Sequence, residues 1–371
     1  MELCQICNNA NGSTFALGKC HICDGKVMET AKMVEKAVQL IPKDAVSFSI
    51  STTIPKDWQI REEKIWDIQT KKAESIKNIL NRTVVAAVKK TTALRYASDG
   101  DCRLVFDYGT GQVSIQKNDL FIFGRYKKIS SGLSQSRWKC SQCEGKGCGQ
   151  CAGKGKYYES VEERIGEPIK TATEAREYVM HASGREDVDA TNSAGRAFVV
   201  EVKEPNKRRM NLEEITKEIG KTGEVEVVDL KVVDRGFVEI VTESHFDKSY
   251  QADVEFGREL TGEDGKKIES LIGKTLLQQT PTRVAHRRAN LVRHRKIKTI
   301  EITNIRKNYA TIIVKAEAGT YIKELISGDN GRTKPSIAEL LGTSAVCKKL
   351  EVTKIEDEFL DFILKGDKRD G

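Results

Sequence analysis

The sequence predicts an α+β protein of two or three domains. Its 371 residues exceed the length of one ordinary domain. Short strand-like stretches alternate with helical ones along the chain, and several strands are half polar, which is typical of an antiparallel sheet with one solvated face. Hydrophobic residues make up 39% and charged residues 31%, so we expect a folded, soluble protein.

The first 24 residues predict a zinc knuckle. Cys4, Cys7, Cys20 and Cys23 form two CxxC pairs with twelve residues between them. Thiolates bind zinc, and each CxxC turn directs two sulfurs at one ion. A redox CxxC is the alternative, but no thioredoxin-like βαβ pattern surrounds these pairs.

Residues 25–155 are expected to form an accessory domain that ends with a second cysteine group. The apolar spacing predicts a helix over 27–41, a strand over 45–54, one long helix over 58–90, a hairpin over 101–116 and an apolar strand over 119–126.

The second cysteine group is a tighter CxxC-x4-CxxC pattern, made by Cys140, Cys143, Cys148 and Cys151. Glycines at 145, 147 and 149 make so short a loop feasible around one ion. The pairs could instead exchange partners with the first group, so we expect one or two zinc ions. Zinc-binding co-chaperones carry similar glycine-rich units, but they have four units and a J-domain, and neither is present. Four thiolates leave no open coordination position, so both sites are expected to be structural.

Residues 156–371 are expected to form the larger domain. Strands are predicted over 196–202, 224–233, 250–256, 298–305 and 309–317, and helices over 211–220 and 262–273. A mixed, largely antiparallel sheet should result.

A basic segment runs from Gln278 to Thr299. It contains seven Lys or Arg residues and two His residues but no acid. Such a segment would repel itself unless an anion lay across it, so we expect contact with RNA phosphates; a solvated basic face is the alternative. The candidate contacts are Arg283, His286, Arg287, Arg288 and Arg293.

The whole chain has a net charge of +8, which permits nucleic-acid binding without establishing it. No run of about 18 apolar residues could span a bilayer. The first residues lack the basic and apolar regions of a secretory signal, so the cytoplasm is the expected location.

The stretch HASGREDVDA, residues 181–190, holds three acids in a loop. Taken alone, it is most simply a solvated polar loop. Asp187 and Asp189 could also hold magnesium, but that ion would need further carboxylates or phosphates.

Several ordered blocks resemble the archaeal and eukaryotic tRNA pseudouridine synthases that act on two adjacent T-loop uridines, positions 54 and 55 of tRNA. The blocks are GREDVDA followed by GRAFVVEV, FDKSYQADV, QQTPTRVAHRRANLVRHRKI, AGTYIKELISGDNGRTKPSIAELLG and GRYKKISSGLSQSRW. The match covers about residues 120 to 360, and the first 120 are only loosely similar to a THUMP-bearing accessory domain. Where the family usually has Arg-Met-Leu after the catalytic motif, this chain has ATNSAGRAF, so the contacts of that loop are not carried over.

The resemblance implies a pseudouridine synthase catalytic domain over 156–371 and a THUMP-like RNA-binding domain over 25–155. Asp187 matches the catalytic aspartate, Tyr250 the active-site tyrosine and Lys323 the basic residue that pairs with the aspartate. Ile322 and Leu350 match apolar residues that line the pocket. If the loop is extended, Asp189 should face away from Asp187, because side chains alternate.

The implied activity is isomerisation of uridine in the tRNA T-arm, at the elbow, with no cofactor for catalysis, no small-molecule cofactor and no membrane. Arg185 is our candidate for holding the flipped-out nucleotide's phosphate or the vacated stack. A non-catalytic, zinc-containing tRNA-binding or tRNA-folding protein would need the basic segment but not Asp187. A metal-dependent nuclease would use Asp187 and Asp189.

Overall fold

The computed structural model describes residues 1–12, 14–68 and 73–366, without the side chains of residues 286, 287 and 366. Contacts divide the chain into two compact units. Unit 1 comprises Met1–Leu120, Lys170–Glu177 and Val202–Met210, and unit 2 comprises Phe121–Ile169, Tyr178–Glu201 and Asn211–Gly371. No helix in the described ranges is long and apolar enough to cross a membrane.

Unit 1 begins with the first cysteine group. Strands β1 (Glu2–Leu3) and β2 (Ala16–Leu17) pair in parallel beside helix α1 (Gln5–Ala10). The four cysteines of the group are buried there, as part of the same apolar core as the rest of the unit.

The rest of unit 1 is a four-stranded sheet covered by helices, in the order β4-β3-β5-β6. Its strands are β3 (Ser47–Thr53), β4 (Arg95–Tyr96), β5 (Cys102–Asp107) and β6 (Gln112–Lys117), and its helices are η1 (Lys26–Glu29), α2 (Thr30–Gln39), α3 (Lys56–Trp66) and α4 (Ile76–Thr91). β5 and β6 form the hairpin that the sequence predicts. Helices α2 and α4 contribute buried faces to the core.

The single helix predicted over 58–90 is wrong, because α3 ends at Trp66 and α4 starts at Ile76. Two side chains fix the start of α4. Ser75 Oγ accepts from the amide of Asn78 at 3.3 Å, and Glu62 Oε1 accepts from the amide of Ile76 at 2.6 Å. Both satisfy amides of a first helical turn, which have no partner within the helix. Residues 69–72 of the predicted helix lie outside the described residues.

Unit 2 is built on a ten-stranded mixed sheet in the order β10-β7-β9-β16-β11-β14-β13-β12-β15, with β8 paired to β9. The strands are β7 (Leu120–Lys128), β8 (Glu177–Ala182), β9 (Thr191–Lys203), β10 (Val225–Val233), β11 (Lys248–Phe256), β12 (Thr275–Gln279), β13 (Val292–Arg306), β14 (Tyr309–Ala316), β15 (Thr333–Lys334) and β16 (Ala345–Ile355). Most pairs are antiparallel, as expected, whereas β9 and β16 run parallel.

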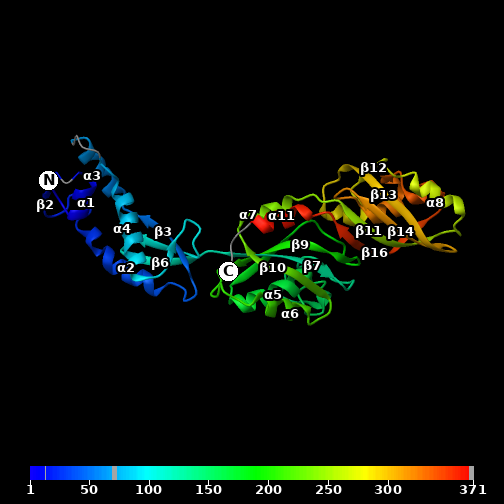
Figure 1. Cartoon of the computed structure of the whole chain (residues 1–371), viewed down its shortest axis with the longest axis horizontal. Coiled ribbons are helices and arrows are strands. Elements are labelled where there is room, and N and C mark those ends of the chain that lie inside the picture. The colour runs from blue at the N-terminus through cyan, green and yellow to red at the C-terminus, as the bar shows by residue number, and fades with distance from the viewer. Residues whose placement is uncertain (13, 69–72, 367–371) are drawn as a thin grey trace. The chain divides into compact units, whose positions relative to one another are not determined.

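Helices cover both faces of the sheet where β7, β9 and β10 lie. Figure 1 shows α7 (Gly236–Glu243) and α11 (Glu358–Gly366) on one face and α5 (Val161–Thr173) and α6 (Leu212–Gly220) on the other. The larger apolar core lies around β11, β13, β14 and β16. The shorter helices are α8 (Gly262–Glu269), α9 (Ile322–Ser327), α10 (Ile337–Leu341), η2 (Gly149–Cys151), η3 (Thr282–Arg287) and η4 (Asp329–Gly331).

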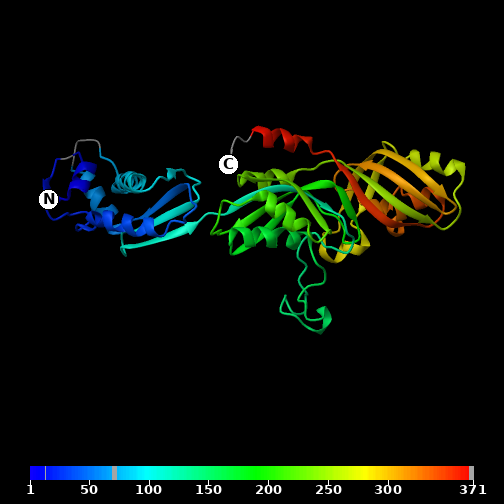
Figure 2. The same ribbon diagram turned by 60° about the horizontal axis from the view of Figure 1, so that its bottom comes forward.

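The second cysteine group lies at the tip of an arm of unit 2. Isolated bridges pair Ser134 with Ser160 and Lys139 with Lys156. These two runs of chain extend away from the sheet and carry η2 at their end (Figure 2).

The unit boundary therefore lies earlier than the expected one at residue 155. Strand β7 pairs with β10, which is about a hundred residues later in the chain, so β7 and the arm that follows it belong to unit 2.

Candidate active site

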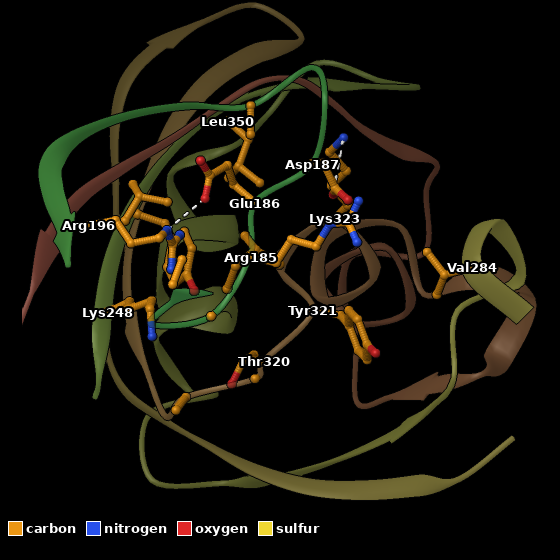
Figure 3. A pocket seen from close by; sticks show the side chains of 18 of the residues that line it. Arg185, Glu186, Asp187, Arg196, Lys248, Val284, Thr320, Tyr321, Lys323 and Leu350 are labelled. Atoms are coloured by element: carbon orange, nitrogen blue, oxygen red, sulfur yellow. Dashed lines mark ion pairs between the residues drawn. The ribbon is translucent and has the colours of Figure 1, made fainter. Parts of the chain in front are cut away.

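A cavity of about 470 Å³ in unit 2 collects most of the candidate site residues. Its wall comes from the loop after β8, from β11 and β16, from the basic segment and from the start of α9. Of the sequence-predicted residues that the structure describes, the cavity is lined by Arg185, Asp187, Tyr250, Arg283, Arg288, Arg293, Ile322, Lys323 and Leu350. Figure 3 labels four of them, Arg185, Asp187, Lys323 and Leu350.

Side chains of neighbouring segments hold the backbone of the loop that carries Asp187. Buried Lys128 donates from Nζ to the carbonyls of Asp187 at 3.0 Å and Val188 at 2.8 Å. Gln135 donates to the carbonyl of Gly184 at 2.8 Å, and Gly184 has a φ of +81°, a conformation that glycine adopts readily. The path of the loop is therefore fixed by side chains of β7 and the segment after it.

Glu186 points into the protein, away from Asp187 (Figure 3). One carboxylate oxygen accepts from the hydroxyl of Tyr126 at 2.6 Å, and the other lies 2.7 Å from Arg196 Nε. The side chains of Glu186 and Arg196 are 2% and 1% exposed. Arg196 also donates to the carbonyl of Ser183 at 2.6 Å. The buried Arg196 therefore holds the loop at two positions, Ser183 and Glu186.

Asp187 faces two cations. Its Oδ1 lies 2.6 Å from Arg283 Nη1, and its Oδ2 lies 3.7 Å from Lys323 Nζ. Lys323 is closer to Asp189, at 2.6 and 2.7 Å, and that hydrogen bond lowers the pKa of Asp189 although partial burial acts to raise it.

The extended loop on which the expectation for Asp189 depended is not present, and Asp187 and Asp189 line different cavities although both lie near Lys323. The stretch from Arg185 to Asp189 is an irregular loop that ends in a turn rather than a strand, so its side chains do not alternate. The amide of Ala190 donates to the carbonyl of Asp187 at 3.1 Å, which closes that turn. Both carboxylates consequently reach the same lysine.

Arg283 lies against carboxylates of the site. Besides Asp187, it contacts Glu324 through Nε at 2.7 Å and Nη2 at 3.4 Å. Glu324 is buried, with 5% of its side chain exposed, and Arg283 is 35% exposed. Arg283 thus links the basic segment to the loop that carries Asp187 and to α9.

Tyr250 is the third residue of β11, opposite Val352 of β16 and Val314 of β14. The residue is buried in the cavity wall, and burial raises the pKa of its phenol to about 12. The phenol of Tyr250 is therefore protonated at neutral pH. Lys248 lies two residues earlier in the same wall, and burial lowers the pKa of its ammonium to about 8.

The apolar side of the cavity is formed by Ile322, Leu350 and Val352. Buried Gln278 holds the residue before Ile322: its side chain donates to the carbonyl of Tyr321 and accepts from the amide of Tyr321, both at 2.9 Å. This paired contact sets where α9 begins.

Three cations of the basic segment line the cavity. Arg288 donates to the hydroxyl of Tyr321 at 3.1 Å, and the guanidinium of Arg293 lies 5.7 Å from the centre of the Tyr321 ring. Arg283 is the third. The side chains of His286 and Arg287 lie outside those that the structure describes.

Each cysteine group is self-contained, and its geometry fits one tetrahedral ion. Four sulfurs at about 2.3 Å from one ion lie about 3.8 Å apart. The distances Cys4–Cys23 and Cys7–Cys23 are 3.7 Å, and the distances Cys140–Cys148 and Cys143–Cys151 are 3.8 Å. All ligand atoms of each group lie within 4.8 Å of one another, so the pairs do not exchange between groups.

Sequence reasoning missed the residues that position the loop. Tyr126, Lys128 and Arg196 lie within two of the blocks that carry the family resemblance, GRYKKISSGLSQSRW and GRAFVVEV, but the resemblance assigns them no role. The available signal was an arginine and a lysine within otherwise apolar strands, RAFVVEV and DLFIFGRYKK, where a buried charge needs a partner.

Comparison with known proteins gives one consistent result. A family model described as "Pus10, C-terminal" matches residues 121–356. The tRNA pseudouridine synthase Pus10 of Korarchaeum cryptofilum is 35% identical over 360 residues, which cover 95% of this chain and 96% of that protein. The protein of the same name from Archaeoglobus fulgidus is 36% identical over 361 residues, covering 96% and 100%. A solved Cbf5–Nop10–Gar1 complex covers 63% of this chain and 50% of that chain at 17% identity, with a TM-score of 0.34.

Proposed function

Because the chain belongs to the Pus10 family of tRNA pseudouridine synthases, we propose that it isomerises uridine to pseudouridine in the tRNA T-loop, at position 54, position 55 or both, with Asp187 as its catalytic carboxylate. The observation that carries this assignment is the cavity in which Asp187, Tyr250 and Lys323 meet.

The reaction is an isomerisation whose atoms balance without a cofactor. The bond between N1 and C1′ breaks, a bond between C5 and C1′ forms, C5 loses a proton and N1 gains one. What the protein must supply is a carboxylate near C1′, a support for the base and a route for the proton.

Asp187 is the group proposed to act at C1′. A carboxylate at this position can attack the sugar or stabilise the sugar-derived intermediate. Arg283 Nη1 contacts Oδ1 at 2.6 Å, Lys323 Nζ lies 3.7 Å from Oδ2, and Lys128 donates to the backbone carbonyl of Asp187. These contacts fix the carboxylate before substrate arrives, which favours reaction by pre-organisation.

Tyr250 is proposed to support the target base. Its phenol stays protonated at neutral pH, since burial raises its pKa to about 12. A protonated phenol can stack on the base and donate a hydrogen bond to it. A phenolate that removes the proton from C5 would first have to lose its own proton, which the raised pKa disfavours. Ile322, Leu350 and Val352 supply the apolar surroundings of the base.

The proposed RNA partner is the T-arm at the tRNA elbow. The target uridine must leave its stack to reach Asp187, which costs a few kcal/mol and less in a loop than in a duplex. Arg288 and Arg293 lie at the cavity, with Arg185 also in its wall, and are proposed to contact the phosphates or the vacated stack. The THUMP-like identity of unit 1 and a cytoplasmic location are part of the same proposal.

The two cysteine groups are proposed to hold one structural zinc ion each. The ligand set is four thiolates in both cases, which is the usual set for structural zinc.

The decisive test uses an unmodified tRNA transcript. Pseudouridine is mapped by carbodiimide treatment and primer extension after incubation with wild-type protein, with Asp187→Asn and with Asp229→Asn. Asp229 is a matched control, because its side chain is 59% exposed and its φ of +58° suits asparagine. We expect T-loop pseudouridine with wild type and Asp229→Asn and none with Asp187→Asn.

Full activity of Asp187→Asn would refute the aspartate assignment. A wild-type protein that binds tRNA without modifying it would instead support the alternative, a non-catalytic zinc-containing tRNA-binding or tRNA-folding protein. Magnesium-dependent strand cleavage would support a nuclease.

A further inference from the structure

A second cavity, of about 600 Å³, adjoins the catalytic loop and is lined by Asp189. We call it the Asn192 cavity; the wall residues used below are Ser130, Ser131, Thr191, Asn192, Lys349 and Glu351. It lies where β9 and β16 meet, and these strands pair only at Glu351–Thr191 and Val352–Asn192. Its size falls within the range of ligand-binding cavities, roughly 300–1,000 Å³.

Two polar groups in this wall are buried without a partner. Asn192 is 0% exposed, and its Nδ2 has no hydrogen-bond partner within the described part of the chain. The same holds for the hydroxyl of Thr191, again counting only described residues. The other end of the Asn192 side chain is used, since Oδ1 accepts from the amide of Ala194 at 3.0 Å, so the amide is oriented with its donor left over. A buried donor without a partner costs free energy that a ligand would recover.

Three lysines line the described wall of the Asn192 cavity, and two of them are engaged by protein groups. Lys348 is paired with Glu255 at 2.7 Å, and Lys128 is engaged with two carbonyls. Lys349 is exposed and makes no ion pair with any residue that the structure describes.

The wall also contains acceptors, which restricts the ligand. Glu351 accepts from the hydroxyl of Ser193, and its second oxygen remains an acceptor. A bare anion would be repelled by this carboxylate, whereas a sugar hydroxyl would donate to it. One lysine, an amide donor, serine hydroxyls and a carboxylate together match a ribose with its phosphate.

We propose that the Asn192 cavity binds the ribose-phosphate of an RNA nucleotide close to the target uridine. In this arrangement, Lys349 and Ser131 contact the phosphate, Asn192 Nδ2 donates to an acceptor of the nucleotide, and the hydroxyl of Thr191 accepts from its 2′-hydroxyl. The proposal rests on the proposed function. It adds a second anchor: Asp187 lies in one cavity and Asp189 in the other, so one strand of RNA would be held on both sides of the catalytic loop.

The first test is binding of unmodified tRNA as a function of salt. We compare Lys349→Gln with Lys217→Gln, which removes the same charge from the exposed face of α6. Loss of one phosphate contact should raise the Kd of Lys349→Gln by about three- to tenfold and reduce the log–log salt slope by about 0.7–0.9. Lys217→Gln should match wild type in Kd, in salt slope and in kcat. Equal Kd and slope for the two variants would overturn the proposal.

The second test asks whether a 2′-hydroxyl is read. Thr191→Val removes the unpartnered hydroxyl at nearly constant volume. Transcripts with a single 2′-deoxynucleotide at successive T-arm positions are bound to wild type and to Thr191→Val. We expect one position to weaken wild type by about two- to fivefold and to have no effect on the variant. The same loss in both proteins at every position would contradict a ribose contact.

Further outcomes distinguish an RNA phosphate from free phosphate, and they distinguish failure of this inference from failure of the proposed function. If Lys349→Gln abolishes binding of inorganic phosphate but leaves tRNA binding intact, the cavity is a free-phosphate site and the RNA proposal fails. Binding and modification are measured separately. If wild type binds tRNA but makes no pseudouridine, only the proposed function is refuted. If wild type makes pseudouridine and Lys349→Gln binds tRNA like wild type, only this inference is refuted.

Discussion

Arg283 contacts two carboxylates, so its removal should affect stability and activity through different partners. Arg283→Met leaves the buried carboxylate of Glu324 without its cation, and we expect a loss of about 1–3 kcal/mol, less than for a fully buried pair because Arg283 is partly exposed. Arg283→Met with Glu324→Gln should regain most of this stability, because no uncompensated charge remains. It should stay poorly active, because Asp187 still lacks its closest cation. Urea unfolding and tRNA modification measure the two effects; an unstable double variant would contradict the explanation.

The buried Glu186–Arg196 ion pair should contribute more to the free energy of unfolding than the exposed ion pair of Asp229 with Arg125 does. Glu186→Ala leaves a buried guanidinium unpaired, so we expect a loss of about 3–5 kcal/mol. Asp229→Asn, which removes an exposed ion pair and keeps a side chain suited to the φ of +58°, should cost at most about 1 kcal/mol. Thermal unfolding compares them, and similar melting temperatures would mean that the pair does not stabilise the loop.

Lys128 should make stability depend on alkaline pH. Burial lowers its pKa from 10.5 to about 8, so between these values the unfolded chain binds more protons than the folded protein. The free energy of unfolding therefore rises with pH through this window as far as Lys128 contributes, and is flat below pH 8. Lys128→Met should reduce the rise, as measured by urea unfolding from pH 7.5 to 9.5. An unchanged slope would show that Lys128 does not titrate there.

Among single residues, the resemblance assigned roles to a few positions of the matched blocks but did not show which other residues of those blocks contact one another in the fold. Asp187, Tyr250 and Lys323 were assigned by resemblance, and they line one cavity. Glu186 lies ten residues from Arg196 and sixty from Tyr126, and nothing in GRED indicates that one acid is buried while the next faces the cavity. Burial of that kind depends on strands that are distant in the chain.

Among the elements, the basic segment makes the clearest prediction for binding. Arg288→Ala should weaken tRNA binding by about two- to tenfold and reduce the salt slope by about 0.7–0.9. Arg306→Ala is the control, since Arg306 ends strand β13 and lies outside the cavity wall. Filter binding at several salt concentrations gives both slopes; identical slopes for the two variants would contradict a phosphate contact.

The cysteine groups make a prediction about metal content. Because each group is complete, elemental analysis should give two zinc ions per chain. Cys143→Ser should reduce this to about one, whereas Cys347→Ser, outside both groups, should leave it at two. A single ion in wild type would mean that one group is not a zinc site.

Element prediction succeeded where the signal is local. The hairpin β5–β6 follows from alternating residues around a glycine-containing turn. The break between α3 and α4 was missed because Ser75 is followed three residues later by asparagine, so the usual Ser-x-x-Glu signature of a helix start is absent. Strand β7 was recognised, but its partner β10 is a hundred residues away and no local pattern identifies it.

For the whole molecule, the fold class could be predicted and the division of the chain could not. Composition and alternation were enough for a mixed, mainly antiparallel sheet. The two units, however, each contain separate stretches of sequence, and unit 1 recruits Lys170–Glu177 and Val202–Met210. A boundary drawn at a single residue cannot describe such an arrangement.

One four-thiol group lies in each unit, so the zinc ion proposed for each group would report on the unfolding of its own unit. Thiols that hold a metal react slowly with colorimetric thiol reagents, whereas thiols released by unfolding react at once. If the units unfold separately under increasing denaturant, metal and reactive thiols will be released in two stages. If they unfold together, both will be released in one, and the serine variants identify which stage belongs to which unit.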